Sequence, residues 1–317
     1  MVAFKKFFVI GIIAAFALGV TGCGSGSAPQ PITQSAFAMD TIATLTVYGD
    51  SQTAQTAIDA ALERLEQLEG VFSYTRSDSE LSRLNATAYG QAVEVGDDMG
   101  FLIQESLRLS ELTEGAFDIS IGALVDLWSV PDSLAPLTPE TADIAELLPN
   151  MGYGNIIYQN NTLRYANPHI KMHFGAIAKG YAVDELVKVL ERHGVTSAFV
   201  DIGGEIGVIG NSPRNDGVWR IGIRDPFEPS EIASTLTVSP PLGALATSGN
   251  YERPEHILEP ATGRPAQSEF ASVTVVSHSG TLSDALSTAF FVMGKAKASA
   301  LAEQMEGVDF VYIEKLD

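Results

Sequence analysis

Two oxygen-bearing side chains near the C-terminus have the types and spacing of a metal site. Asp284 and Thr288 stand four residues apart in an apolar stretch, so on an α-helix they share one face. A carboxylate and a hydroxyl are hard oxygen ligands that suit Mg²⁺. A second interpretation is that Ser283 or Asp284 only caps the helix while Thr288 bonds back to a carbonyl. The spacing alone favours this second interpretation, because two-residue matches arise often by chance.

Other segments also carry groups able to bind a ligand. Asp118 lies in a largely apolar run, where a buried carboxylate either satisfies backbone donors in a turn or contacts a ligand. Lys179 lies where a small-residue loop enters a helix, and free amides at a helix start bind anions. His256 lies in a turn-rich segment of the kind that forms binding loops. Tyr74 can stack on a heteroaromatic ring, but covering the core is the more common role of a loop tyrosine.

The glycine-rich segments do not match the known nucleotide-binding loops. Residues 175–182 lack the Gly-Lys-Ser/Thr order of a P-loop. The segment that begins Gly203-Gly204-Glu205 lacks the G-x-G-x-x-G order of a dinucleotide site and is typical of a tight hairpin. The sequence therefore does not support a P-loop or a Rossmann site in these segments.

Length and charge limit the fold and the partners. The 317 residues, 45% of them hydrophobic, are enough for one large domain or two ordinary ones. Acidic side chains outnumber basic ones by 39 to 19, and the formal net charge is −20. This balance argues against nucleic acid or an anionic membrane surface as a principal partner. An anionic small molecule can bind only where local groups or a metal offset the negative field.

The N-terminus has the order of a bacterial export signal. Lys5 and Lys6 precede an uncharged apolar run over residues 7–20, which is short for a membrane span. The run ends in Val20-Thr21-Gly22-Cys23, which resembles a lipobox and holds the only cysteine of the chain. We therefore expect a signal peptide over residues 1–22, a lipidated tether over 23–35 and one folded domain over 36–317. The lipid on Cys23 is then the only membrane contact, on the outer side of the cytoplasmic membrane, facing the periplasm or the exterior.

Hydrophobic periodicity predicts a mixture of helices and strands, and the closeness of the later strands in the chain implies antiparallel pairing. We expect Gly70 to end the first helix and Ser77 with Glu80 to form a capping box for the next. Pro139 is expected in the first position of a later helix. The expected helices cover residues 52–69, 97–114, 138–148, 283–293 and 295–305, and a further helix follows the small-residue loop within residues 175–186 and lasts until His193-Gly194. The expected strands cover residues 41–48, 198–202, 219–224, 234–238, 271–276 and 310–313.

Taken together, these segments resemble the FAD:protein FMN transferases of the ApbE family. The stretches that carry the resemblance occur in the family's order and extend over the whole domain. They are Met39-Asp40-Thr41, Gly115-Ala116-Phe117-Asp118, Gly175-Ala176-Ile177-Ala178-Lys179-Gly180-Tyr181-Ala182, Thr247-Ser248-Gly249-Asn250-Tyr251 with His256-Ile257, and Asp284-Ala285-Leu286-Ser287-Thr288-Ala289. With a lipobox in front, this order reverses the preference at Asp284 and Thr288 in favour of a metal.

The resemblance implies a fold and an activity. The fold is α+β, with mostly antiparallel sheets, packed helices and T-fold-like duplicated halves. The activity is a Mg²⁺-dependent cleavage of the substrate FAD, which releases AMP and leaves FMN esterified to a threonine or serine of an exported protein. Two alternatives stay open: an exported FAD pyrophosphatase that uses water as the acceptor, and a flavin-binding lipoprotein without chemistry.

The resemblance also implies residue roles. The metal ligands are the side chains of Asp284 and Thr288 and the backbone carbonyl of Ala176. Lys179 and His256 are the catalytic candidates, with His256 near the phosphate. Because imidazole titrates near neutral pH, either His256 or a nearby carboxylate is the candidate base. The flavin-binding positions are Met39, Tyr74, Ala116, Phe117, Asp118, Lys179, Asp184 and Ile257.

The chain departs from the family pattern at two places. His173 stands where the family usually has an aspartate, before the Phe-Gly-Ala-Ile-Ala-Lys-Gly run. Glu259, in Leu258-Glu259-Pro260, replaces the aspartate of the usual Ile-Asp-Pro and keeps the carboxylate. His173 removes a carboxylate near the predicted metal, and so weakens the cation site, tunes it or simply packs beside it.

Overall fold

A computed structural model describes residues 30–128, 139–214, 216–238, 243–251 and 255–316. The predicted signal peptide, Cys23 and most of the predicted tether therefore lie outside the described residues. Within these ranges, none of the helices combines the length and apolar character needed to cross a membrane.

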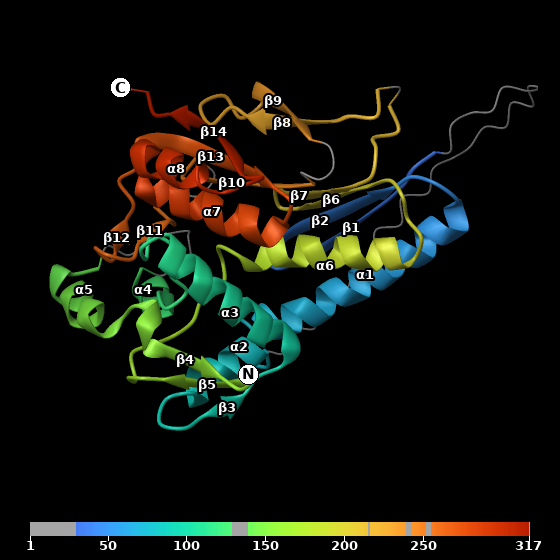
Figure 1. The fold of residues 1–317 in the computed structure, drawn as a ribbon. Helices are drawn as coiled ribbons and strands as arrows, with labels where there is room; N and C mark the ends of the chain where they lie inside the picture. The colour runs from blue at the N-terminus through green and yellow to red at the C-terminus, as the bar shows by residue number, and fades with distance from the viewer. Residues whose placement is uncertain (1–29, 129–138, 215, 239–242, 252–254, 317) are drawn as a thin grey trace, which may run out of the picture.

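A seven-stranded antiparallel sheet forms the centre of the fold (Figure 1). Its strand order follows two hairpins, β1 with β2 and β6 with β7, and then the later strands of the chain. The expected α+β class with antiparallel pairing is confirmed. The strands are, in spatial order, β1 (Ile32–Ala38), β2 (Thr41–Val47), β6 (Ala198–Ile202), β7 (Glu205–Ile209), β10 (Ala244–Gly249), β13 (Phe270–Ser277) and β14 (Asp309–Glu314).

Three helices cover one face of this sheet, and a hairpin covers part of the other. The helices are α1 (Ser51–Phe72), α6 (Ala178–Arg192) and α7 (Gly280–Met293), and α6 packs between the other two. The hairpin consists of β8 (Trp219–Arg224) and β9 (Ile232–Val238). Alternate residues of β8, including Trp219 and Ile221, point into a small cluster between the hairpin and the sheet, as the two-residue period of a strand requires.

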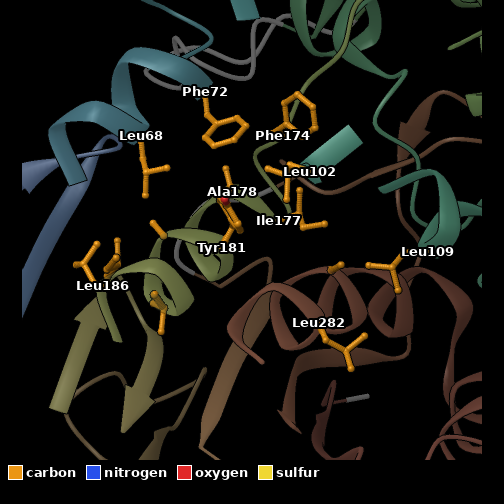
Figure 2. Packing of buried hydrophobic residues seen from close by; sticks show 14 of the residues in the cluster. Leu68, Phe72, Leu102, Leu109, Phe174, Ile177, Ala178, Tyr181, Leu186 and Leu282 are labelled. Carbon is orange, nitrogen blue, oxygen red and sulfur yellow. The ribbon is translucent and has the colours of Figure 1, made fainter. Parts of the chain in front are cut away.

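The large core lies on the helical side of the sheet. Figure 2 shows Leu68 and Phe72 of α1 facing Tyr181 of α6 and Phe174 of the preceding loop. The rings of Phe72 and Tyr181 pack edge to face with centroids 5.7 Å apart. Each such buried side chain contributes about 1.5–3 kcal/mol. This packing fixes the start of α6, where Lys179 lies.

The remaining elements form a smaller region beside the sheet and its helices (Figure 1). A three-stranded sheet has the order β3, β5, β4, and β11 pairs with β12 in a short hairpin. The elements are α2 (Glu80–Thr87), β3 (Val93–Glu94), α3 (Asp97–Leu112), α4 (Gly122–Leu127), α5 (Thr141–Leu147), the 3-10 turns η2 (Leu148–Asn150) and η3 (Tyr153–Asn155), β4 (Ile156–Gln159), β5 (Thr162–Tyr165), β11 (Leu258–Glu259) and β12 (Arg264–Pro265). Helix α8 (Lys295–Ala302) instead packs against α7, beside the main sheet.

Tertiary contacts shift several of the expected boundaries. α1 continues through Gly70, because the buried side chain of Phe72 holds the last turn against the core. Ser79, not Ser77, caps α2 by accepting a hydrogen bond from the Ser82 N–H, so the expected capping box is wrong. The carboxylate of Glu80 instead accepts a hydrogen bond from the N–H of Gly96 at 2.7 Å.

Other boundaries differ at the helix ends and at the tether. α5 begins at Thr141 with Glu140 as its N-cap, so Pro139 lies before the helix, and Thr138 is outside the described residues. α8 ends at Ala302. Residues 32–35, which the sequence placed in the tether, belong to strand β1, so the sheet begins before residue 36.

Candidate active site

Asp284 lies inside helix α7, in its second turn. Ser279 caps the helix, with its hydroxyl accepting a hydrogen bond from the N–H of Leu282 at 3.3 Å. Ser283 instead shares a hydrogen bond with Ser277 at 2.9 Å between the two hydroxyl oxygens. The interpretation of Ser283 or Asp284 as a helix cap is therefore wrong. The carboxylate of Asp284 instead accepts a hydrogen bond from a neighbouring helix.

The first turn of α6 holds the Asp284 carboxylate from the opposite side. The N–H of Gly180 donates a hydrogen bond to Asp284 Oδ2 at 2.9 Å, and Asp284 is only 2% exposed. A Cβ at position 180 would overlap the carbonyl oxygen of Gly280 and lie 2.6 Å from the Cβ of Asp284. Glycine thus lets α6 and α7 approach closely enough for this bond. Burial raises the pKa of Asp284, while the charge of Lys179 and the Gly180 hydrogen bond oppose the increase.

Lys179 lies between two buried carboxylates. Its Nζ is 2.5 Å from Glu205 Oε1 and 4.0 Å from Asp284 Oδ1. Glu205 is 4% exposed, and within the described part of the chain its second oxygen, Oε2, has no hydrogen-bond partner. Burial raises the pKa of Glu205, and the nearby positive charge of Lys179 works against that increase. The group therefore combines two buried acids with one cation whose side chain is 26% exposed.

A two-residue turn directs Glu205 toward the helices. Gly203 and Gly204 both have positive φ, +64° and +97°, and they close the β6–β7 hairpin between the paired residues Ile202 and Glu205. Glu205 shares a strand face with Gly207, and a Cβ at Gly207 would meet the side chains of α6. The turn thus places the carboxylate opposite Lys179.

A second turn lies beside this one at the same end of the sheet. Met39 and Asp40 connect β1 to β2, and both have left-handed φ values, +53° and +60°. The N–H of Gly203 donates to the carbonyl of Ile42 at 3.2 Å, which joins the two turns. Met39 packs against the main core. The predicted flavin-binding Met39 therefore lies at the same end of the sheet as Glu205.

Thr288 lies one turn after Asp284 and meets the end of β10. Its hydroxyl shares a hydrogen bond with the hydroxyl of Ser248 at 2.9 Å, and among the residues that the structure describes it makes no bond back to a carbonyl. Ser248 also bonds to Ser287 at 2.8 Å. The Thr247-Ser248-Gly249 stretch and the Asp284 helix, distant in sequence, are thus brought together.

The oxygen donors in this group fit a magnesium ion. The N–H of Gly180 donates to Asp284 and not to the carbonyl of Ala176, four residues earlier, which would be its usual helical acceptor. Among the described residues no other backbone N–H bonds to that carbonyl. Asp284, Thr288 and Ala176 offer a carboxylate, a hydroxyl and a carbonyl, which are hard ligands. No cluster of three or more His, Cys, Asp or Glu side chains able to hold a metal occurs in the described ranges. A cation at Asp284 therefore has to take further ligands from neutral oxygens or from a phosphate-bearing substrate.

Asp184 has a different environment from the predicted flavin contact. Its carboxylate accepts four hydrogen bonds at the N-terminus of α7. The donors are the Ser279 hydroxyl at 2.7 Å, the Gly280 N–H at 2.6 Å, and the Thr281 N–H and hydroxyl at 2.9 and 2.6 Å. A carboxylate there satisfies otherwise free amides and interacts favourably with the helix dipole. The contacts give Asp184 a structural role.

Asp118 and its neighbours lie between α3 and α4. Asp118 Oδ1 accepts from the N–H of Ser120 at 2.7 Å, and Oδ2 accepts from the N–H of Tyr153 at 2.9 Å. Asp118 thus does satisfy backbone donors, and burial raises its pKa although these bonds oppose the increase. Phe117 is 3% exposed, whereas Ala116 is half-buried. Contact of these three residues with a flavin stays a prediction.

Tyr74 and His173 pack against each other. Their rings lie edge to face with centroids 4.7 Å apart, and the Tyr74 hydroxyl donates to Asp126 Oδ1 at 2.7 Å. The Nδ1 of His173 accepts a hydrogen bond from the N–H of Gly175 at 3.2 Å, in the loop that leads to α6. The histidine that departs from the family pattern is thus part of the packing of this loop.

The His256-Ile257 stretch leads into β11. His256 is half-buried, and Ile257 is buried and accepts a hydrogen bond at its carbonyl from the N–H of Ala266 at 2.8 Å. Residues 252–254, just before it, are outside the described ranges. The predicted roles of His256 as a base and of Ile257 in flavin binding stay predictions.

Comparison with known proteins decides the family. The model of the ApbE family matches residues 39–312. The chain belongs to the ApbE family. It is 32% identical over 330 residues to the FAD:protein FMN transferase of Treponema pallidum, covering 96% of this chain and 90% of that protein. It is 34% identical over 264 residues to the one from Vibrio cholerae, covering 80% and 77%.

Solved structures of ApbE proteins have the same fold. The ApbE protein from Thermotoga maritima matches with a TM-score of 0.81 at 30% identity, over 90% of this chain and 94% of that one. The flavin transferase ApbE from Vibrio cholerae matches with a TM-score of 0.79 at 32% identity, over 91% and 94%. The predicted family and the α+β fold are confirmed. This ApbE chain is an enzyme of the flavin-transferring class.

Glu205 is the site residue that the sequence analysis did not identify. The sequence predicted only a tight hairpin at Gly203-Gly204-Glu205. The reasoning applied to Asp118 also applies to Glu205, because Glu205 is an acidic residue at the start of the fully buried strand β7.

Proposed function

We propose that this ApbE protein cleaves the pyrophosphate of FAD, transfers FMN to a threonine or serine of an exported protein and releases AMP. Mg²⁺ is the required cofactor in this proposal. One observation carries it. The buried Asp284 carboxylate is held by Gly180, with Thr288 one helical turn away and Lys179 4.0 Å from its Oδ1.

Asp284, Thr288 and the Ala176 carbonyl are the residues that hold the cation. A Mg²⁺ ion held by these residues would supply positive charge to neutralise the pyrophosphate and the leaving phosphate. Lys179 supplies a further positive charge at the start of α6. These cations matter because the chain has a formal net charge of −20, whose field repels an anionic substrate.

The transfer forms one bond and breaks another. The hydroxyl oxygen of the acceptor attacks the phosphorus of the FMN half, and the bond from that phosphorus to the bridging oxygen breaks, so AMP leaves with the electron pair. His256 accepts the hydroxyl proton, because imidazole titrates near neutral pH. If His256→Gln left the transfer rate near that of the wild type with the fold intact, another group would be the base.

In this proposal the flavin ring is held by the positions that the family resemblance implies. The proposed contacts are Met39, Tyr74, Ala116, Phe117, Asp118 and Ile257, and Lys179 contacts the phosphates. Met39 at the β1–β2 turn and the buried Phe117 and Ile257 provide apolar surface, as ligand pockets usually do. Asp184 is left out, since four donors of α7 already occupy its carboxylate.

The cell envelope is the proposed location. Lipidation of Cys23 after removal of residues 1–22 anchors the enzyme on the outer side of the cytoplasmic membrane, where exported acceptors fold. Metabolic labelling with a fatty acid tests this. Label on the wild type and none on Cys23→Ser is expected, and equal labelling contradicts the proposal.

One incubation separates transfer from the alternatives. The protein is incubated with FAD, Mg²⁺ and a domain that bears an acceptor threonine, and the products are separated by size. Flavin fluorescence attached to the acceptor, with an equal amount of AMP, is expected. Free FMN and AMP indicate hydrolysis, and unchanged FAD indicates binding alone. Asp284→Asn is the matched control for metal-dependent chemistry.

A further inference from the structure

We propose that Glu205 is a positioning residue that keeps the Lys179 ammonium away from Asp284 and so leaves Asp284 available to the metal ion. This inference rests on the proposed cation site at Asp284. It concerns a residue to which neither the sequence pattern nor the family resemblance assigned a role.

The distances show how Lys179 is shared. Its Nζ contacts Glu205 Oε1 at 2.5 Å, whereas Asp284 Oδ1 is 4.0 Å away. Both carboxylates are buried, at 4% and 2% exposure, so neither is screened well by water. An ammonium that loses one buried carboxylate partner moves to the other one, because an unpaired buried charge is unfavourable. Without the charge of Glu205, Lys179 is therefore expected to pair with Asp284 and compete with a divalent cation.

The hairpin fixes Glu205 in this position. The Gly203-Gly204 turn pairs Ile202 with Glu205, and the side-chain period of two then directs Glu205 toward α6. A register slip by one residue would turn the carboxylate to the other face of the sheet. Since the turn has two glycines with positive φ, its conformation is well suited to this register.

The second oxygen of Glu205 indicates that a ligand binds nearby. Oε2 is buried and accepts no hydrogen bond from any of the residues that the structure describes, which is unusual for a carboxylate in a folded protein. A donor supplied with the substrate or with the cation, such as a bound water, satisfies this oxygen when the site is filled. Glu205 then acts on the site without being one of the ligands that Asp284, Thr288 and Ala176 provide.

A double-mutant cycle on metal affinity tests the inference without measuring activity. Binding of Mn²⁺ alone to flavin-free, chelator-treated protein is followed by electron paramagnetic resonance. The four proteins are the wild type, Glu205→Gln, Lys179→Met and the double variant. Glu205→Gln keeps the shape of the side chain, and thermal melting shows whether each variant is folded.

We expect Glu205→Gln to weaken Mn²⁺ binding on the order of tenfold or more when Lys179 is present, as for coupled buried charges. In the Lys179→Met background the same change should have little effect, since the competing ammonium is gone. Equal loss in both backgrounds would identify Glu205 as a direct ligand or a simple electrostatic contributor and overturn the inference.

The control is Asp201→Asn, in the same hairpin. Asp201 pairs with Ile206 and lies on the opposite face of the sheet from Glu205. The Asp201→Asn substitution removes one negative charge, as Glu205→Gln does. The amide oxygen of the new asparagine can still accept a hydrogen bond from the N–H of Gly204, which is 2.8 Å long in the wild type. Mn²⁺ affinity within about twofold of the wild type is expected; a loss as large as that of Glu205→Gln would contradict the positioning role.

The outcomes for the two proposals differ. If the wild type binds no Mn²⁺ saturably, the proposed cation site fails and the inference fails with it. If the wild type binds Mn²⁺ but the two substitutions act independently, the cation site stands and only the role of Glu205 is wrong.

Discussion

The N–H of Gly180 and the carboxylate of Asp284 are joined by a hydrogen bond of 2.9 Å that connects α6 to α7. The two residues lie 104 positions apart in the chain. The bond requires a glycine, because a Cβ at position 180 would overlap the backbone of Gly280. The same contact thus packs two helices and orients the carboxylate on which the proposed chemistry depends.

Gly180→Ala is expected to separate the two helices. Forcing a methyl group into this contact should lower the free energy of unfolding by about 1–3 kcal/mol and abolish Mg²⁺-dependent cleavage of FAD. Gly70→Ala is the control, since nothing lies within 4 Å of a Cβ there and Gly70 is inside α1. It should stabilise the protein by up to about 1 kcal/mol. Thermal melting and FAD cleavage measure both, and an active, stable Gly180→Ala protein would contradict the role of the contact.

Asp284→Asn should separate stability from activity. The amide oxygen can keep the hydrogen bond from Gly180, and removal of a buried charge leaves the Tm near or above that of the wild type. Cleavage of FAD should fall on the order of 100-fold or more, because the cation loses its carboxylate. Thr288→Ser should retain most activity and Thr288→Val should lose it. Full activity of Asp284→Asn at saturating Mg²⁺ would contradict the proposal that Asp284 is a metal ligand.

Asp184→Ala is expected to act on folding rather than on flavin binding. It removes the acceptor of four hydrogen bonds at the start of α7, which should lower the free energy of unfolding by about 3 kcal/mol. The KM for FAD, measured well below the Tm, should not change. An unchanged Tm with a raised KM would instead restore Asp184 to the flavin site.

The ion pairs of Arg64 predict acid sensitivity. Arg64 contacts Asp98 Oδ1 at 2.5 Å and Glu185 Oε2 at 2.7 Å, which joins α1, α3 and α6. Partial burial acts to raise the pKa of both carboxyls. Hydrogen bonds from Arg64 and Tyr181 to Asp98 nevertheless lower the pKa of Asp98 below its ordinary value of 3.8. Hydrogen bonds from Lys188 and Arg64 likewise lower the pKa of Glu185 below its ordinary value of 4.5. The stabilisation is therefore present above those values and lost as the pH falls through the lowered pKa values.

Arg64→Met should lower the free energy of unfolding by about 2 kcal/mol at pH 7. Its difference from the wild type should shrink as the pH is lowered below about 4, where the carboxyls become protonated. Arg108→Met, which breaks the more exposed pair with Glu105, should cost less than about 1 kcal/mol. Chemical denaturation over a pH series measures this. A difference that stayed constant down to pH 2 would show that the loss comes from packing alone.

Local pattern was enough to predict some of the site. The spacing of Asp284 and Thr288 correctly predicted that they share a helix, and the small-residue loop before Lys179 correctly predicted the start of α6. Periodicity predicted the mixture of helices and strands, and the family resemblance predicted the α+β class. These features depend on residues that are neighbours in the chain, and local sequence specifies them well.

Pairing between distant segments could not be predicted in the same way. Lys179 pairs with Glu205, and the donors to Asp184 come from the Ser279–Thr281 segment. The packing of α6 against β7 and α7 creates both contacts. The edge strand β1 is half polar, so its sequence resembles a tether as much as a strand. Gly70 is a helix breaker by propensity, but the burial of Phe72 outweighs that preference.

At the left-handed turn of Met39 and Asp40, stability favours glycine, whereas the proposed flavin contact requires the side chain of Met39. Neither is a glycine, and each non-glycine residue in this conformation costs roughly 1–2 kcal/mol. A search for more stable variants would therefore select glycine at this turn and, at position 39, remove the side chain proposed to face the flavin. Thermostability screens of this enzyme should exclude the turn, and a stabilised variant that has lost flavin affinity should first be sequenced there.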